Sequence, residues 1–307
     1  MSGLKAQEMS STEEEQATSC ATPAAPPPYS GAVPITPPHQ IEPPLITIPK
    51  LLPPFAPHRP FPPLMTAYCI YSLSLSTFRQ FNICAAANKH DILFTAQLST
   101  GFVPHTPLGS RPGIILHNGP TTKDPVLAAA GAESISSSTT MSFNTRSVVI
   151  LPPVSAPPEA TPNAMVTTMM RASRAQEDKG VVFRLSVVVS AEGHRKEEFE
   201  WRKVGGLGAE GKEKGYKMLR LAPPGEEEHE VVGILTWPVG TIEKLTKVFT
   251  LELKGGALSG QLGERVVLMM LVTASRLWWM RLKGQTAKGY VAVAEKTHGK
   301  QAQGQEW

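Results

Sequence analysis

Short runs of apolar and β-branched residues recur along the middle of the chain and predict β-strands. The clearest run is VVFRLSVVVS at 181–190, which is rich in valine. After a polar turn, residues 198–202 alternate charged and aromatic side chains with a period of two, which is typical of a strand with one buried face. These two runs predict a β-hairpin.

Similar runs lie on both sides of this hairpin. Asn and Asp between 81–84 and 92–95 favour a tight turn and a second hairpin. Further strands are predicted at 113–116, 126–130, 147–151, 215–221, 231–237 and 247–253. Short strands at regular spacing, separated by Gly, Pro and charged residues, indicate a mainly β sandwich or barrel.

One segment near the C-terminus has a helical pattern. Residues 263–283 contain no Gly or Pro after the first residue, and Gly284 follows as a C-cap, which predicts a helix about 31 Å long. Residues 266–274 are apolar on nearly every side, so we expect a helix buried all round. A membrane span is the alternative, but Arg276 interrupts the uncharged stretch well short of the ~20 residues that a bilayer requires.

The domain boundaries follow from composition. Proline is dense in residues 1–63 and the apolar residues there form no face, so we expect a disordered tail that cannot offset the entropy of ordering. The domain itself is expected at 64–285, with 64–76 as an extra strand or a remnant of the tail. Residues 152–178 are expected to form a loop insertion with a short helix near 165–174, and 286–307 a polar, flexible tail.

Charge and cysteine content narrow the class of protein. The formal net charge of +4 is far below that of a nucleic-acid binder, so no nucleic-acid partner is expected. Cys20, Cys69 and Cys84 form neither an even disulfide framework nor a CxxC pair, which favours a reducing compartment. The N-terminus has no apolar signal region, so a cytoplasmic location is expected.

Three motifs that could support catalysis or cofactor binding are incomplete. The GxGxxG at 206–211 leads into a strand rather than a helix, and Gly233 stands where an HExxH motif beginning at His229 needs its second histidine. His117 and Asp124 lie among ordinary turn formers, with no nucleophile elbow. We therefore predict no catalytic residue, metal or cofactor, and a non-enzymatic binding protein.

Several stretches resemble the tubby C-terminal-like fold, which the tubby proteins and the LURP-one-related family share, and are similar to a group of fungal tubby-like proteins of unassigned function. They are LFTAQLSTGF (93–102), RPGIILHNGPTTKDPVLAAAG (111–131), EEFEWRKV (197–204), GYKMLRL (215–221) and LGERVVLMMLVTASRLWW (262–279). The resemblance implies a closed antiparallel barrel of about 12 strands around the C-terminal helix. It also implies a membrane-surface role, because animal tubby proteins bind phosphoinositides through Lys and Arg on the barrel.

Basic residues around the predicted hairpin of 198–202 and 215–221 are the candidates for lipid binding. They are Arg202, Lys203, Lys212, Lys214, Lys217 and Arg220. If the two strands pair, several of them would project from one edge and form a patch for anionic phospholipid, such as phosphoinositide, at a cytoplasmic membrane surface. The alternative is a solvated strand edge that Lys protects against aggregation.

The tail contains a second candidate site. Pro26, Pro27, Pro28 and Tyr29 form a PPxY motif, the polyproline II ligand of WW domains. Such motifs also arise by chance in proline-rich tails. If this one is functional, the protein is a protein-interaction adaptor that recruits a WW-domain partner, such as a ubiquitin ligase.

Overall fold

A computed structural model describes most of the chain from residue 56 onward. The described residues are 56–69, 79–86, 88–133, 145–153, 165–175, 180–189, 195–207, 213–222, 228–238 and 246–303. The PPxY residues 26–29 and Lys212 lie outside them, as does Cys20.

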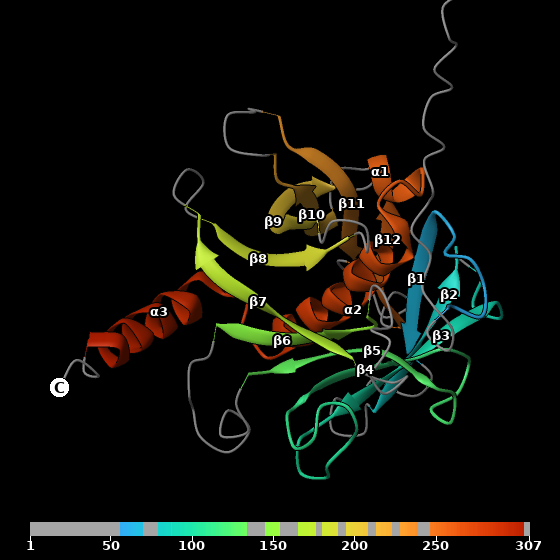
Figure 1. Cartoon of the computed structure of the whole chain (residues 1–307), viewed down its shortest axis with the longest axis horizontal. Helices are drawn as coiled ribbons and strands as arrows, with labels where there is room; N and C mark the ends of the chain where they lie inside the picture. The colour runs from blue at the N-terminus through green and yellow to red at the C-terminus, as the bar shows by residue number, and fades with distance from the viewer. Residues whose placement is uncertain are drawn as a thin grey trace, which may run out of the picture. The chain divides into compact units, whose positions relative to one another are not determined.

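Twelve antiparallel strands form a closed barrel in which each strand pairs with its neighbours in the sequence and β1 pairs with β12 (Figure 1). The strands are β1 (Leu64–Cys69), β2 (Gln80–Ala85), β3 (Ile92–Ser99), β4 (Gly113–His117), β5 (Val126–Ala132), β6 (Arg146–Leu151), β7 (Val166–Arg174), β8 (Val181–Val188), β9 (Lys196–Leu207), β10 (Glu213–Arg220), β11 (Glu230–Trp237) and β12 (Lys247–Leu253). The predicted fold class and the predicted hairpins are confirmed.

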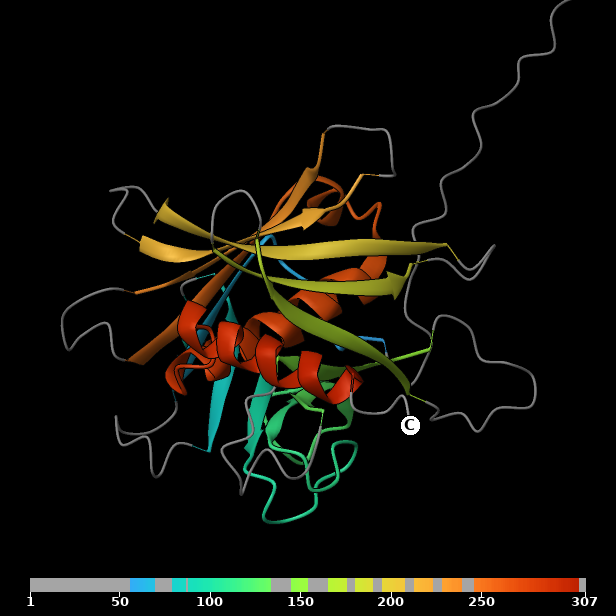
Figure 2. The same cartoon turned by 90° about the vertical axis from the view of Figure 1, so that its left-hand side faces the viewer.

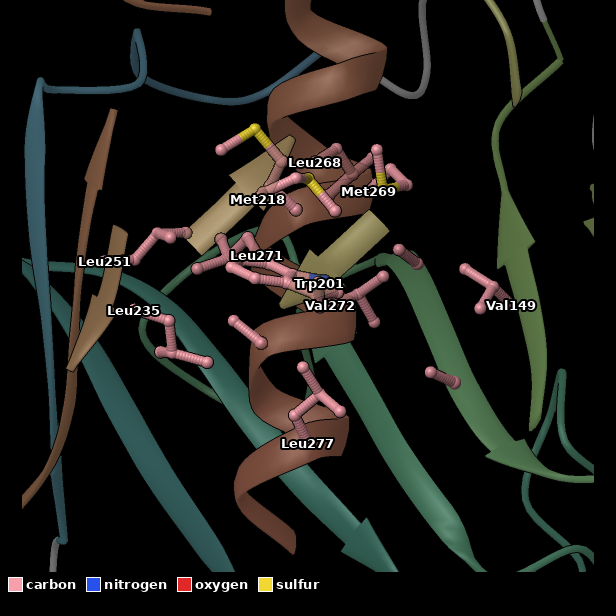
Figure 3. Packing of buried hydrophobic residues seen from close by; sticks show 14 of the residues in the cluster. Val149, Trp201, Met218, Leu235, Leu251, Leu268, Met269, Leu271, Val272 and Leu277 are labelled. Carbon is pink, nitrogen blue, oxygen red and sulfur yellow. The ribbon is translucent and has the colours of Figure 1, made fainter. Parts of the chain in front are cut away.

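The long helix α2 (Gly263–Leu282) runs through the barrel, after the short helix α1 (Gly255–Leu258). Its predicted range was 263–283, and it is buried on all sides as expected. Figure 3 shows Leu268, Leu271 and Leu277 of α2 among side chains from the surrounding strands. Helix α2 is apolar on all sides because it lies inside the barrel, where strands surround it.

The approach between α2 and β11 is close enough to require a glycine. A Cβ built on Gly233 would lie 2.2 Å from Cε of Met270. No heavy-atom contact of that length is tolerated in a packed core, so any larger residue at this position would displace the methionine.

The barrel has two distinct ends because all of its strands are antiparallel. One end, here called the α3 end, carries the last residues of the odd-numbered strands and the first residues of the even-numbered strands. Helix α2 finishes at this end, where Arg281 lies over the ring of Trp237, at the end of β11. The opposite end, called the α1 end, holds the start of α2.

A third helix, α3 (Lys288–Gln303), occupies much of the segment that was expected to be a flexible tail. That expectation was wrong because Val291 and Ala294, three residues apart, are fully buried. Glu295 on the same helix accepts hydrogen bonds from the backbone N–H and from Nε of Arg174 on β7. Helix α3 therefore lies outside the strands, beside β7 (Figure 1).

The structure also corrects two other expectations and settles one alternative that the sequence left open. Residues 56–63, assigned to the tail, contact the barrel: the rings of Phe61 and Phe94 lie 5.5 Å apart, and the Asn118 amide donates to the Ala56 carbonyl at 2.9 Å. Residues 64–69 form β1, so this part of the apolar run 64–76 belongs to the barrel. The short helix expected near 165–174 is strand β7, because its backbone pairs with both β6 and β8.

Candidate anion-binding surface

The basic residues predicted to form one patch are divided between the two ends of the barrel. Strands β9 and β10 do pair, and Lys217 lies directly opposite Arg202. However, Lys203 and Lys214 lie toward the α3 end, whereas Arg220 is the last residue of β10 at the α1 end. The idea of a protected edge is also wrong, because a closed barrel leaves β9 and β10 paired on both sides.

The two arginines of this set are neutralised by carboxylates. Arg202 forms an ion pair with Glu200 at 2.8 Å, and Arg220 pairs with Glu197 at 2.6 Å and with Glu230 at 3.1 Å. Burial opposes the charge on Arg220, yet the hydrogen bonds and the negative charge of the two glutamates raise its pKa. Both arginines therefore stabilise the barrel, and Lys203 and Lys214 are the exposed cations of the hairpin within the described chain.

A different set of cations forms a row across three neighbouring strands. Arg146 on β6 is directly opposite Arg171 on β7, which is directly opposite Arg184 on β8. We call these three residues the arginine row. Since adjacent strands lie about 4.8 Å apart, the row spans roughly 10 Å. Like charges directly opposite each other destabilise a sheet, so the row needs anionic partners to offset the repulsion.

The outer members of the arginine row have carboxylate partners, but the central one does not. Arg146 pairs with Glu133 at 3.3 Å, and Arg184 pairs with Glu200, whose side chain is completely buried, at 2.6 Å. Arg171 is exposed and has no ion pair within the described part of the chain. Its guanidinium is therefore available to a phosphate or carboxylate from outside.

A hollow of about 370 Å³ lies over the arginine row. It is lined by Thr145, Arg146, Arg171, Ala172, Ser173, Arg184 and Glu295. Glu295 comes from α3, which lies beside β7 (Figure 2), and brings one carboxylate to the lining. Arg146 and Arg184 are paired with carboxylates, so the excess positive charge at the hollow comes from Arg171, and it favours anions.

The last turns of α2 add positive charge behind this surface, inside the barrel. Arg276 is almost completely buried, and its Nε donates to the hydroxyl of Ser147, the residue that follows Arg146, at 3.2 Å. Burial lowers the pKa of Arg276 to about 10. Burial, together with the charge of Arg276, also lowers the pKa of Lys283, whose ammonium lies 4.8 Å from the centre of the Trp279 ring.

The α1 end holds a larger pocket with balanced charge. This pocket, of about 950 Å³, includes Arg195, Glu197, Arg220 and Glu230 in its lining. Glu197 pairs with both arginines, and Glu230 pairs with Arg220 while it accepts the backbone N–H of Gly256 at 2.5 Å. These four groups therefore satisfy each other, and the remaining charged residues of the lining, Lys196, Glu198 and Glu228, add no excess of positive charge. The pocket is for this reason a weaker candidate for binding an anion.

The histidine and aspartate that were weighed as a catalytic pair do not contact each other through their charged groups. Nδ1 of His117 lies 2.9 Å from the backbone carbonyl of Asp124, and Nε2 lies 3.0 Å from the amide oxygen of Gln97. The Asp124 carboxylate instead accepts the N–H and the hydroxyl of Thr121. These hydrogen bonds hold a turn, which is the ordinary role of Asp and Asn between strands.

The described ranges contain neither a group of metal-ligating side chains nor a helix that could span a membrane. There, no three His, Cys, Asp or Glu side chains are grouped so as to hold a metal ion. None of the helices described combines the length and apolar character needed to span a bilayer.

Comparisons with protein-family models, with curated proteins and with solved structures gave no match to this chain. The resemblance to tubby-like proteins therefore stays a prediction.

Proposed function

We propose that this protein is a non-enzymatic binding module for anionic phospholipid at the cytoplasmic surface of a membrane. The observation that carries the proposal is the arginine row with Arg171 at its centre, exposed and without an ion pair in the described chain. The basic lysines of the β9–β10 hairpin, Lys203 and Lys214, lie toward the same end of the barrel and would add attraction of longer range.

The chemistry of the arginine row suits phosphate. Guanidinium groups bind phosphate oxygens through paired N–H donors, and they lose less hydration than an ammonium does. Arg171 is unpaired in the described chain, and Arg146 and Arg184 on either side of it have further N–H donors beyond those that bind their glutamates. Donors spread over roughly 10 Å suit a headgroup with several phosphates on one ring, which favours phosphoinositide over lipids with a single charge. Anionic lipid is concentrated on the cytoplasmic leaflet, where each basic residue near the surface contributes about 1 kcal/mol.

The test is vesicle flotation of the full-length chain. The vesicles contain phosphatidylcholine with or without phosphatidylinositol bisphosphate, at low and at high salt. We expect flotation that requires the phosphoinositide and weakens with salt, because the attraction is electrostatic. Arg171→Glu changes the local charge by two and is expected to weaken binding by about 2 kcal/mol.

The matched control is Lys196→Glu, which reverses an exposed charge at the α1 end. This variant is expected to bind almost as well as the natural chain. Failure of the folded natural chain to float with phosphoinositide would reject the proposal, and equal losses for both variants would reject the arginine row as its site.

The PPxY motif supports a second candidate function, that of a protein-interaction adaptor. Residues 26–29 read PPPY, and a WW domain binds this sequence as a polyproline II helix followed by the tyrosine ring. Titration of isolated WW domains with the full-length chain would test it. Tyr29→Ala is expected to abolish this binding and to leave vesicle flotation unchanged; binding that survives the substitution would exclude the motif.

A further inference from the structure

The loop between β3 and β4 exposes two neighbouring apolar side chains. Phe102 is 77% exposed and Val103 is 60% exposed, the two highest values among the large hydrophobic residues described. The loop comprises residues 100–112 and projects from the barrel at the bottom of both views, in teal (Figure 1, Figure 2). An isolated exposed apolar residue needs no explanation, but an adjacent pair on one loop marks a candidate surface of interaction.

The loop is internally braced, so the exposure of these side chains is a fixed feature of the fold. His105 and Gly109 exchange two backbone hydrogen bonds, of 3.1 and 2.7 Å. At the base of the loop, the hydroxyl of Ser99 donates to the carbonyl of Arg111 at 3.2 Å. Gly101 has a φ of +85°, and a Cβ there would lie 2.8 Å from the carbonyl oxygen of Ser110, so the two arms of the loop nearly touch.

One apolar residue of the same loop, Leu108, is buried and anchors the loop to the barrel, whereas Phe102 and Val103 are exposed. Leu108 is 1% exposed and packs with Ile115, Ala129, Val148 and Ile150 in a small cluster separate from the main core. Leu108 thus packs the loop against an apolar site on the outside of the barrel. Phe102 and Val103 remain in solvent beyond that site.

The loop lies next to the arginine row. Val148, which Leu108 joins in the cluster, is two residues from Arg146 on β6, and residues two apart in a strand share a face. Polar contacts also connect the loop to the arginine row. Nε of Arg111 donates to the carbonyl of Glu133 at 3.2 Å, and the carboxylate of Glu133 pairs with Arg146. The loop and the arginine row therefore share one region of the α3 end.

We propose that Phe102 and Val103 insert into the acyl boundary of an anionic bilayer while the arginine row contacts the headgroups above it. This inference rests on the proposed lipid-binding function and names the part of the barrel that faces the membrane. An exposed apolar pair on a loop beside a basic surface combines the two forces that hold peripheral proteins on membranes, which are burial of apolar area and attraction to anionic lipid.

The experiment compares flotation of the full-length natural chain with that of the double variant Phe102→Ser, Val103→Ser. The vesicles are phosphatidylcholine with phosphatidylinositol bisphosphate, at two salt concentrations. Because burial of one apolar side chain changes an affinity by roughly tenfold or more, the double variant is expected to bind at least about tenfold more weakly. Its dependence on salt should be unchanged, since no charge is altered. Leu258→Ser, which replaces a 53% exposed apolar residue at the α1 end, is the control and should bind normally.

A second measurement reports the depth of the loop directly. Phe102→Trp adds an indole whose emission, taken as the difference from the natural chain, should shift to the blue with vesicles and be quenched by brominated acyl chains. Normal binding of the double variant, an equal loss in Leu258→Ser, or the absence of quenching would overturn the insertion while the lipid-binding function stands. Failure of the natural chain to float at all would overturn both proposals.

Discussion

Trp201 on β9 donates its indole N–H to the hydroxyl of Thr273 on α2, at 3.0 Å, and both side chains are completely buried. The Thr273 hydroxyl in turn donates to the carbonyl of Met269, one turn earlier in the helix, at 2.7 Å. The polar atom of the tryptophan is therefore satisfied inside an otherwise apolar interior. Because the bond is directional, it also fixes the rotation of α2 relative to the strand that holds Trp201.

Thr273→Val tests this contact. The substitution keeps the shape of the side chain and leaves the Trp201 indole N–H buried without a partner, which costs about 1–3 kcal/mol of the free energy of unfolding. Urea denaturation measures the loss. Ser275→Ala is the control: Ser275 is equally buried, but its hydroxyl donates only to the Leu271 carbonyl in its own helix, so a loss below about 1 kcal/mol is expected. Equal losses for the two variants would contradict a specific role for the tryptophan bond.

Leu271→Asp tests the central position of α2. Leu271 is completely buried within the barrel, and a carboxylate there would have no partner and no water. We expect the variant to be unfolded, as measured by circular dichroism and by its sensitivity to protease. Leu282→Asp, at the exposed last turn of the same helix, should fold normally. A soluble, cooperatively folded Leu271→Asp variant would contradict the buried helix.

The strands and the central helix were predictable because each contains its own signal. The valine-rich sequence of β8 predicts a buried strand by itself, and the uninterrupted apolar sequence of α2 predicts a buried helix by itself. Helix α3 and strand β7 were missed for the opposite reason. Helix α3 is polar on average, and among residues 288–296 the buried apolar side chains are Val291 and Ala294. Segment β7 is a strand because β6 and β8 provide hydrogen-bonding partners on either side.

The candidate site depended on register, which the sequence does not reveal. Arg146, Arg171 and Arg184 come from three separate strands, and only the pairing of those strands places them opposite one another. The basic residues of the predicted β9–β10 hairpin do not form a single patch, because Arg220 lies at the opposite end of the barrel from Lys203 and Lys214. Whether a basic residue is available depends on carboxylates elsewhere in the chain, such as Glu230 beside Arg220. One usable signal was present: Arg184 is the single charge in the apolar run of β8.

Cys69 and Cys84 are predicted to react slowly in the folded protein. Burial raises the pKa of each thiol from 9.0 to about 11, so the thiolate at pH 8 is roughly 100-fold scarcer than in the unfolded chain. Peptide-resolved alkylation by iodoacetamide, with and without urea, measures the ratio.

The same pKa shift predicts the direction of a pH effect on stability. The folded state favours the neutral thiol, so this contribution is complete below pH 9 and is lost as the pH rises toward 11. The free energy of unfolding should therefore fall less over this range in a variant with Cys69→Ala and Cys84→Ala. Rapid alkylation of the folded chain at pH 8, or identical pH profiles, would contradict the shift.

Glu295→Gln is expected to strengthen binding to anionic vesicles. Glu295 is the carboxylate in the lining of the hollow over the arginine row, and it pairs with Arg174 at 2.6 Å. Its neutralisation removes a charge that repels phosphate and frees the Arg174 guanidinium, so affinity should rise by about 1 kcal/mol, or roughly fivefold. Glu198→Gln, which neutralises an exposed carboxylate at the α1 end, is the matched control and should change affinity much less. An equal gain in both variants would mean that the net charge of the chain, and not the arginine row, governs binding. An unchanged affinity in Glu295→Gln would place the headgroup elsewhere on the barrel.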